Sequence, residues 1–377
     1  MEYTEVKNLG IIGTGNTPSM KNPAFYDSPD IPFFKPSDIS DNITKLSKSE
    51  YFISNNAREK ARIFPKGTVL CTCIGIIGKI GIVQQESACN QQINYIIPNK
   101  NFVSAFIAYS LKFQKQKMID IGKDAPIVPI INKTKFEKIQ IPICSLTEQK
   151  RIVAELDNIE AGIRVKQEQL KALDELIQSR FTEMFGNIKT KDKISNLCLI
   201  NPTKPKNIDD DLLVSFLPMS NVSEQGNADL SIIRKYKEVK KGFTYFQDND
   251  ILFAKITPCM ENGKGALVKN LKNHIGFGST EFHVIRIQQS LVPQYLFTIT
   301  QSKSFRSLAK EYMTGAVGQQ RVPASFIENF SIPVPPLPLQ NQFAEFVQKV
   351  ERAKEIVKIQ IDDLRELLAL KMDEYFK

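Results

Sequence analysis

The sequence predicts an α+β protein in which two mixed α/β globular domains alternate with two long helices. Three observations lead to this fold class. One pattern runs twice through the sequence, the first part of each repeat is rich in β-branched, aromatic and turn residues, and the second part is poor in glycine with apolar residues at helical spacing. We expect the two helices to pair as an antiparallel coiled coil, with an approximate twofold axis relating the tandem repeats.

The repeat is clearest where each globular domain gives way to its helix. Residues 136–149 match residues 327–340 at a shift of 191, and the same shift places 180–185 on 371–376. Three more pairs of segments correspond with small changes of offset, as loops of different length produce; they are 6–12 with 194–200, 37–40 with 220–223, and 67–70 with 249–252. We therefore divide the chain into domain 1 (1–146), a central helix (147–185), domain 2 (186–336) and a C-terminal helix (337–377).

Each globular domain is expected to contain both strands and helices. Short apolar runs such as Thr68–Val83 and Glu281–Ile287 have the length and composition of strands. Helices are predicted near Val103–Gln116 and Pro293–Tyr312.

The two long helices carry apolar residues in alternating steps of four and three, the spacing of a left-handed coiled-coil seam. Lys166 interrupts this seam in the first helix and Lys354 in the second. At about 1.5 Å per residue, the first helix would be a rod of about 58 Å, longer than one domain of this size requires. An amphipathic helix packed only on its own domain is the alternative, because periodicity does not identify the partner. The predicted seam positions are Ile152, Leu156, Ile159, Ile163, Leu170, Leu173 and Ile177, with Phe343, Val347, Val350, Val357, Ile361, Leu364 and Leu368.

Chain connectivity sets the direction of this pairing. The first helix ends at Phe185, and only residues 186–193 join it to domain 2, where the second helix begins. Paired helices must therefore run antiparallel, with one globular domain at each end. A capping box over Ser145–Glu148 fits the start of the first helix, and Pro338 stands where a proline in the first turn is tolerated.

The composition is that of an ordinary globular protein with an excess of positive charge. The 377 residues are 42% hydrophobic and 24% charged, and the formal net charge is +9 with a pI near 9.0. Clustered lysine and arginine favour an anionic partner such as a phosphate backbone, although a solvated basic face is the common alternative. No apolar run approaches the roughly 18 residues of a membrane span, and the charged start lacks a signal region, so a cytoplasmic protein is expected.

The residue types of a catalytic or metal centre are scarce. The six cysteines form no C-x-x-C pair, which favours reduced thiols over zinc or disulfides, and His274 and His283 stand in no ligand or nucleophile spacing. The glycine pattern of 75–81 departs from the known phosphate-binding signatures and precedes a strand-like segment. Asn201-Pro-Thr-Lys204 lacks the second proline and the aromatic residue of an amino-methyltransferase motif. We therefore predict no catalytic residue, metal or cofactor in this chain.

The order of domains and helices, together with four motifs, resembles the specificity subunit of Type I restriction-modification systems over essentially the whole chain. The motifs are Gly15-Asn-Thr-Pro-Ser19, Gly276-Phe-Gly-Ser-Thr-Glu-Phe-His283, Gly315-Ala-Val-Gly-Gln-Gln-Arg-Val-Pro323 and Ile332-Pro-Val-Pro-Pro-Leu-Pro-Leu-Gln340. The first half departs from this pattern, because 124–129 replaces the glycine- and glutamine-containing block at 315–320 and Cys144-Ser145 replaces the second proline pair.

The resemblance implies a non-catalytic protein that reads double-stranded DNA. Each globular domain would be a target recognition domain for one half of a bipartite, gapped site, and the helices would set the unread spacer. Two methyltransferase subunits, and restriction subunits for cleavage, would be the partners. Those partners would bring S-adenosylmethionine and ATP, with methylation on adenine N6.

Candidate DNA contacts follow from side-chain chemistry, because Arg, Lys, Asn and Gln pair with purine edges while Ser, Thr and Lys more often hold phosphates. Each candidate flanks a landmark of the repeat, and a solvated surface residue is the alternative for each. The candidates are Asn16, Thr17, Lys79, Gln91 and Gln92 in domain 1, with Lys255, Thr257, Lys264, Gln319, Gln320 and Arg321 in domain 2.

Apolar helix positions outside the seam form a second candidate surface. Val153, Val165, Phe346 and Leu367 would either contact the methyltransferase or extend the intramolecular contact.

Two other functions fit the same sequence. One is a DNA-binding decoy or regulator that recruits no enzyme, and the other is a coiled-coil scaffold whose globular ends bind proteins. Steep loss of DNA affinity with added salt would separate a DNA reader from a protein scaffold.

Overall fold

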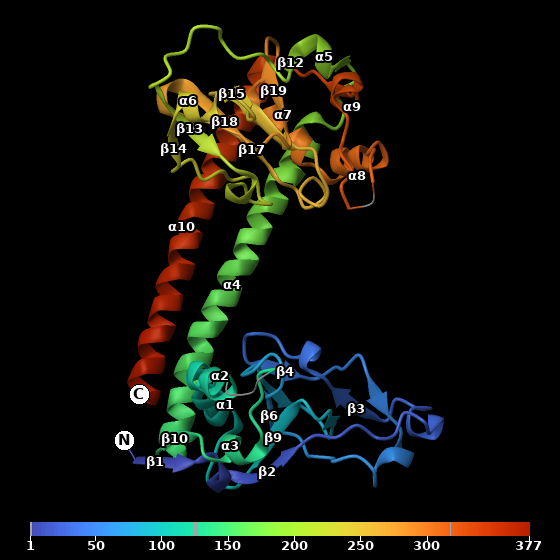
Figure 1. Cartoon of the computed structure of the whole chain (residues 1–377), viewed down its shortest axis with the longest axis vertical. Coiled ribbons are helices and arrows are strands. Elements are labelled where there is room, and N and C mark those ends of the chain that lie inside the picture. Colours follow the sequence, from blue (N-terminus) through green and yellow to red (C-terminus); the bar gives the residue numbers. More distant parts are fainter. Residues whose placement is uncertain (1, 124–126, 317) are drawn as a thin grey trace. The chain divides into compact units, whose positions relative to one another are not determined.

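The structure is a computed structural model that describes residues 2–123, 127–316 and 318–377. The chain divides into two compact units, which are described separately. Unit 1 comprises residues 1–167 and 359–377, and unit 2 comprises residues 168–358. Each unit therefore contains one globular domain and one stretch of each long helix (Figure 1).

Domain 1 is built on a five-stranded mixed sheet in the order β2-β9-β6-β7-β4 and a three-stranded sheet in the order β5-β3-β8. The β4–β7 and β3–β8 pairs are parallel, and the remaining pairs are antiparallel. A third pair, β1–β10, precedes the first long helix. The strands are β1 (Glu2–Glu5), β2 (Gly10–Thr14), β3 (Ile31–Phe34), β4 (Thr44–Leu46), β5 (Phe52–Ile53), β6 (Val69–Thr72), β7 (Ile80–Val83), β8 (Ala88–Cys89), β9 (Ile93–Pro98) and β10 (Gln140–Ile143).

Helix α1 (Ser104–Phe113) joins the sheet of domain 1 to the long helices of unit 1. Its residues Ile107 and Leu111 are buried in the core against the sheet, and Phe106 and Tyr109 are buried among long-helix residues. The Tyr109 hydroxyl also donates to the carboxylate of Asp157 at 2.7 Å. A helix with two buried faces is apolar nearly all round, which explains why its sequence lacks a clean amphipathic pattern. Two shorter helices follow it, α2 (Lys115–Gly122) and α3 (Lys133–Glu137).

Domain 2 repeats most of the strand order of domain 1, but among the described residues its first sheet has no strand equivalent to β4 and its second sheet has β15 as an additional strand. Its sheets have the orders β12-β19-β16-β17 and β14-β13-β18-β15, and the β11–β20 pair precedes the second long helix. The β13–β18 pair is parallel, like β3–β8 in domain 1. The elements are β11 (Lys191–Lys193), α5 (Ile194–Leu197), β12 (Cys198–Ile200), β13 (Leu213–Leu217), β14 (Ile233–Lys235), α6 (Tyr236–Val239), β15 (Thr244–Gln247), β16 (Ile251–Ala254), β17 (Gly265–Leu267), β18 (Ile275–Gly278), β19 (Phe282–Ile287), α7 (Pro293–Gln301), α8 (Lys303–Glu311), α9 (Ala324–Asn329) and β20 (Ser331–Pro333).

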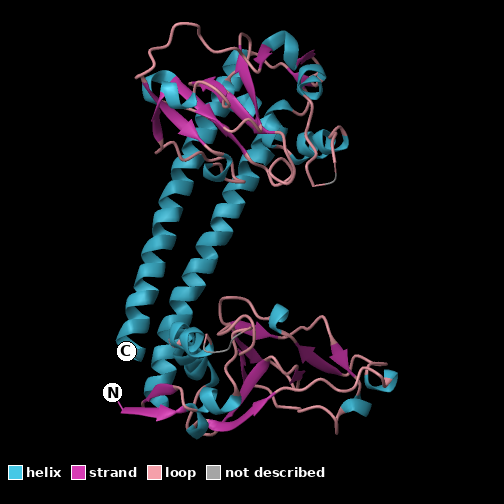
Figure 2. Cartoon of the chain, viewed as in Figure 1, coloured by secondary structure: helices cyan, strands magenta, loops and turns pink. Residues whose placement is uncertain are grey.

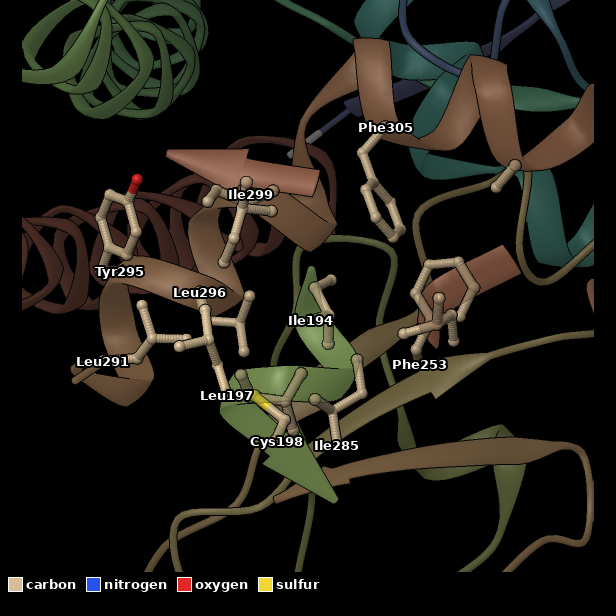
Figure 3. Packing of buried hydrophobic residues seen from close by; sticks show 14 of the residues in the cluster. Ile194, Leu197, Cys198, Phe253, Ile285, Leu291, Tyr295, Leu296, Ile299 and Phe305 are labelled. Carbon is tan, nitrogen blue, oxygen red and sulfur yellow. The ribbon is translucent and has the colours of Figure 1, made fainter. Parts of the chain in front are cut away.

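The main core of unit 2 lies between its first sheet and the helices. Leu296 and Ile299 of α7 lie in one core with Leu197 of α5 and Ile285 of β19, and the Phe253 and Phe305 rings meet edge to face (Figure 3). The predicted helix over Pro293–Tyr312 is in fact two helices. Ser302 has an extended backbone between them, and its hydroxyl accepts from the Phe305 N–H as the N-cap of α8.

The two long helices are α4 (Leu146–Phe185) and α10 (Leu337–Phe376), coloured cyan in Figure 2. In unit 1 the start of α4 packs against the end of α10, with Ile152 and Leu156 in one cluster with Met372 and Tyr375. In unit 2 the end of α4 packs against the start of α10, in a core that includes Ile177, Phe185, Phe343, Val347 and Val350. The expected fold class and antiparallel pairing are confirmed. Each helix also packs on its own globular domain, so its apolar residues make both contacts, and the alternative of a helix packed only on its own domain is wrong.

One buried glutamine ties each globular domain to its helix. The Gln149 side chain accepts from Val103 N–H at 2.9 Å and donates to the Asn101 and Cys144 carbonyls at 3.0 Å each. The Gln340 side chain repeats these bonds with Val292 N–H at 2.8 Å, Ser290 O at 2.9 Å and Pro335 O at 2.8 Å. Both side chains are 0% exposed. The tandem repeat therefore extends to individual hydrogen bonds, and we call each set a glutamine clamp.

Candidate nucleic-acid interface

Three segments of domain 2 meet in one backbone junction, formed by 254–257, 281–284 and 320–322. Lys255 N–H donates to the Glu281 carbonyl at 2.9 Å, and Val322 N–H donates to the Lys255 carbonyl at 2.9 Å. Thr257 N–H completes the set by donating to the Gln320 carbonyl at 3.0 Å. The junction therefore brings together two of the sequence motifs, which lie about forty residues apart in the chain.

Domain 1 contains the same junction, formed by 72–75, 92–94 and 129–131. Cys73 N–H donates to the Gln92 carbonyl at 2.8 Å, and Ile131 N–H donates to the Cys73 carbonyl at 2.9 Å. Gly75 N–H donates to the Pro129 carbonyl at 3.0 Å. Each bond has its counterpart in domain 2, so the backbone frame is shared although 124–129 departs from the motif of the second half. Residues 124–126 of that departing segment, and Val317 of the domain 2 motif, lie outside the described residues.

The side chains on this shared frame differ in chemistry between the domains. Where domain 2 has Lys255, Glu281, Gln320 and Arg321, domain 1 has Cys73, Gln92, Pro129 and Ile130 in the corresponding places. Four apolar side chains of domain 1 are exposed at or beside its junction, namely Ile76, Ile127, Val128 and Ile130. Sequence reasoning missed them, because an apolar run with flanking prolines looks the same whether it ends up in a core or on a surface.

Arg321 is engaged with Glu281. Its Nε and Nη2 groups donate to the two carboxylate oxygens at 2.9 and 2.8 Å, and its Nη1 group donates to the Gln319 carbonyl at 3.0 Å. The hydrogen bond from Arg321 lowers the pKa of Glu281, and the same bond raises the pKa of Arg321. Arg321 therefore holds the loop that carries Gln319 and Gln320, and Glu281 is the partner that sequence reasoning missed.

His283 is a buried residue that is hydrogen-bonded to the domain 2 junction. Its Nε2 lies 2.8 Å from the Val322 carbonyl and its Nδ1 lies 3.1 Å from the Asn201 amide nitrogen. Burial lowers the pKa of His283, so we assign a neutral ring that donates from Nε2 and accepts at Nδ1. Asn201 in turn accepts from Val284 N–H at 3.0 Å. The asparagine of the incomplete methyltransferase motif is thus a bridge between strands.

The candidates of domain 1 have partners within the domain, and Gln92 lies in the junction itself. The Thr17 hydroxyl donates to the Gln91 side chain at 2.7 Å, and the Gln92 side chain accepts from the Asn90 amide at 2.8 Å. Asn16 bonds to the backbone of Lys60 and Arg62. The Lys79 N–H donates to the Thr72 hydroxyl at 3.0 Å, beside the junction. Gln91 and Thr17 are exposed, whereas Asn16, Lys79 and Gln92 are half-buried.

Two further candidates in domain 2 have internal partners, as Arg321 does. The Lys264 ammonium donates to the Met219 carbonyl at 3.1 Å, and the Thr257 hydroxyl lies 3.3 Å from the Gln320 carbonyl. Both residues are half-buried beside the junction. The structure therefore places Lys264 and Thr257 as supports of the loops, while Gln319 is exposed on the loop itself.

Comparison with known protein families agrees with this geometry. The model of the Type I restriction modification DNA specificity domain matches the chain twice, over residues 1–175 and 187–365. The chain belongs to this family. The two matches cover both globular domains and most of both long helices, so one specificity domain of the family corresponds to one repeat of this chain.

Relatives from Escherichia coli match locally. The chain is 46% identical to the Type I restriction enzyme EcoEI specificity subunit over 145 residues, which is 38% of this chain and 24% of the relative. It is 42% identical to the EcoAI specificity subunit over 151 residues, 40% of this chain and 26% of the relative. The chain thus spans about a quarter of the length of these relatives.

Two solved structures share the fold over nearly the whole chain. A chain from a study of complex assembly and conformational transition of the type I R-M system aligns with a TM-score of 0.63 at 15% identity, covering 99% of this chain and 97% of that one. The Type I restriction-modification S subunit from M. genitalium aligns with a TM-score of 0.54 at 10% identity, covering 100% and 96%.

The net positive charge of this member of the specificity-domain family comes from the globular domains. Domain 1 carries 18 Lys and Arg against 12 Asp and Glu, and domain 2 carries 19 against 13, so each has a formal charge of +6. The helix segments 147–185 and 337–377 have formal charges of −2 and −1. A basic domain beside an acidic helix is the distribution expected when the domains, and not the helices, face an anionic ligand.

The helix surfaces differ from expectation in part. Val153 and Phe346 are half-buried against the cores of their own units, and Arg180 lies over the Phe346 ring at 5.8 Å. Val165 and Leu367 are exposed, as are Ile359 and Leu370, which the sequence reasoning did not single out.

The described residues contain no cluster of His, Cys, Asp and Glu that could hold a metal ion. The six cysteines are free, and burial raises the pKa of the Cys198 thiol to about 12. None of the helices in the described ranges has the length and apolar character needed to cross a membrane.

Proposed function

We propose that this chain is a DNA-specificity subunit of a Type I restriction-modification complex, in which each globular domain reads one half of a bipartite, gapped DNA site. The observation that carries the proposal is the duplication itself. The chain contains two domains of one specificity family, each followed by a long helix. Each domain has the same backbone junction and a formal charge of +6.

The physical advantage of two linked domains is effective concentration. Once one domain has bound its half-site, the second binding event becomes intramolecular, and the linkage restricts the distance between the half-sites. Lysine and arginine of the domains supply sequence-independent phosphate attraction, and polar or apolar side chains at base edges supply selectivity. In this proposal the helices act as the ruler for the unread spacer.

The chain itself contributes recognition and no chemistry. Two methyltransferase subunits would supply S-adenosylmethionine-dependent methylation of adenine N6, and restriction subunits would supply ATP-dependent cleavage, all in the cytoplasm. The exposed side chains Val165, Ile359, Leu367 and Leu370 of unit 1 are our candidates for part of the methyltransferase contact, because exposed apolar side chains on a helix without net positive charge favour a protein partner.

The experiment that tests the proposal is a methylation map. The chain is co-expressed with the methyltransferase encoded by a neighbouring gene in a methylation-free host, and the genome is read by single-molecule sequencing. A gapped two-part motif modified on adenine, absent without this chain, supports the proposal. Soluble, co-expressed proteins that produce no motif would contradict it and favour a DNA-binding regulator or a scaffold.

A further inference from the structure

The two junctions share a backbone frame and carry opposite side-chain chemistry, which bears on what each domain reads. We infer that the junction is the base-selecting element of each domain, and that domain 1 selects thymine through its 5-methyl group while domain 2 selects adenine through hydrogen bonds. This inference rests on the proposed function and names the base pairs that would satisfy it.

The domain 1 surface is apolar and preformed. Ile127 is 91% exposed and Ile76 is 57% exposed, and Val128 and Ile130 lie beside them. The bond from Gly75 N–H to Pro129 O and the bridge between Ile74 and Ile130 hold the two segments together. An apolar surface fixed by backbone bonds loses little conformational freedom on binding.

The net charge of domain 1 favours DNA as the occupant of this surface. Domain 1 has a formal charge of +6, so a phosphate backbone is attracted to the same domain that exposes the four apolar side chains. The major groove offers one prominent apolar feature to such side chains, the C5-methyl group of thymine.

Domain 2 presents hydrogen-bonding groups in the same place. Within the described ranges, the side-chain amides of Gln319 and Gln320 make no hydrogen bond, while the Arg321–Glu281 pair fixes the loop beneath them. A glutamine amide can form two hydrogen bonds with adenine at once. Its oxygen accepts from the N6 amino group, and its nitrogen donates to N7. Arg321 is in this account a positioning residue, and Gln319 and Gln320 make the base contacts.

The test uses the full chain in complex with its methyltransferase and the gapped duplex selected by that complex from a random pool. The thymines of one half-site at a time are replaced by deoxyuridine, which removes the methyl group and leaves base pairing intact, and affinities are compared by competition. For one half-site we expect about fourfold weaker binding per contacted methyl group, from the transfer free energy of one such group.

Two variants identify the domain responsible. In I127Q/I130Q the thymine and deoxyuridine duplexes should bind equally. In I11Q, which changes an exposed isoleucine on β2 outside the junction, the discrimination should be that of the wild type. Q319A/Q320A should keep the thymine discrimination and lose selectivity for adenine in the other half-site.

Several results overturn the inference. Equal wild-type binding of thymine and deoxyuridine duplexes in both half-sites, or unchanged discrimination in I127Q/I130Q, removes the methyl contact while leaving the proposed function intact. Loss of the methyltransferase from I127Q/I130Q, with base selectivity retained, would make the apolar surface a protein interface. Selection of no gapped site at all would refute the proposed function together with the inference.

Discussion

Domain 1 and domain 2 agree in backbone and differ in what they expose. Their shared strands follow the same order, their junctions use the same three backbone hydrogen bonds, and each is tied to its helix by a glutamine clamp. At the junction, however, domain 2 carries an ion pair and two glutamines where domain 1 carries exposed isoleucines and a valine. The two repeats therefore share a frame of backbone hydrogen bonds, which does not depend on side-chain identity. The exposed side chains on this frame differ between the domains.

The glutamine clamps should show the largest effect on stability, and the effect should be equal in the two units. Gln149→Leu and Gln340→Leu each leave one buried N–H and two carbonyls without their partners, at a cost of about 3 kcal/mol in the free energy of unfolding. Native-state hydrogen exchange resolved by domain measures the cost in each unit. Gln342→Leu, at an exposed position of the same helix, is the control and should stay within about 0.5 kcal/mol of wild type.

A large cost at Gln340 with less than about 1 kcal/mol at Gln149 would mean that the clamps are not equivalent.

The helix seams differ between the repeats at two positions, because Lys166 corresponds to Val357 and Lys354 corresponds to Ile163. Lys354 of unit 2 is 5% exposed and pairs with Asp174 at 2.8 Å and Glu351 at 2.9 Å, whereas Ile163 stands in the corresponding place of unit 1. Burial lowers the pKa of Lys354, but its bonds to the two carboxylates outweigh burial and raise it overall.

Lys354→Ile should leave unit 2 at least as stable as wild type, because a buried ion pair seldom exceeds a well-packed apolar residue in net stabilisation. Asp174→Leu should instead cost about 1 to 2 kcal/mol, because it removes one of the two carboxylates from a buried ammonium. Urea denaturation of both variants measures these changes in the free energy of unfolding. A strong loss in Lys354→Ile would show that the ion pair is a net source of stability.

His283 gives domain 2 a pH dependence that domain 1 should lack. The folded-state pKa of His283 lies below its ordinary value of 6.5 because the ring is buried, so its contribution to stability is complete above pH 6.5 and is lost as the pH falls toward the folded-state pKa. Asn94 has the corresponding place in domain 1 and bonds to the Ile131 carbonyl. His283→Asn should remove this acid-side loss in domain 2, measured by hydrogen exchange between pH 7 and pH 5. An unchanged pH profile would assign the loss to other groups.

The architecture could be predicted because it depends on patterns that the sequence repeats. A shift of 191 residues, two glycine-poor segments and a short connection were sufficient to predict antiparallel helices between two α/β domains. The break at Ser302 was not predicted, since the apolar pattern continues from α7 into α8 and only the serine cap interrupts it.

The candidate interface was predictable only in outline. Polar residues near the repeated landmarks do gather at the junctions, but the state of each side chain depends on partners distant in sequence. Arg321, for example, donates to the carboxylate of Glu281, which lies forty residues earlier in the chain and cannot be recognised as its partner from the sequence. The exposed Ile127 and Ile130 could not be told from core residues, because exposure depends on the whole fold.

Whether each domain reads its own half-site from a shared frame is tested by the methylation map of Q319A/Q320A beside that of the wild type. We expect a gapped motif in which one half loses a base requirement at one or two positions, while the other half and the length of the gap stay the same. Relaxation of both halves together, or a changed gap with both halves intact, would contradict it.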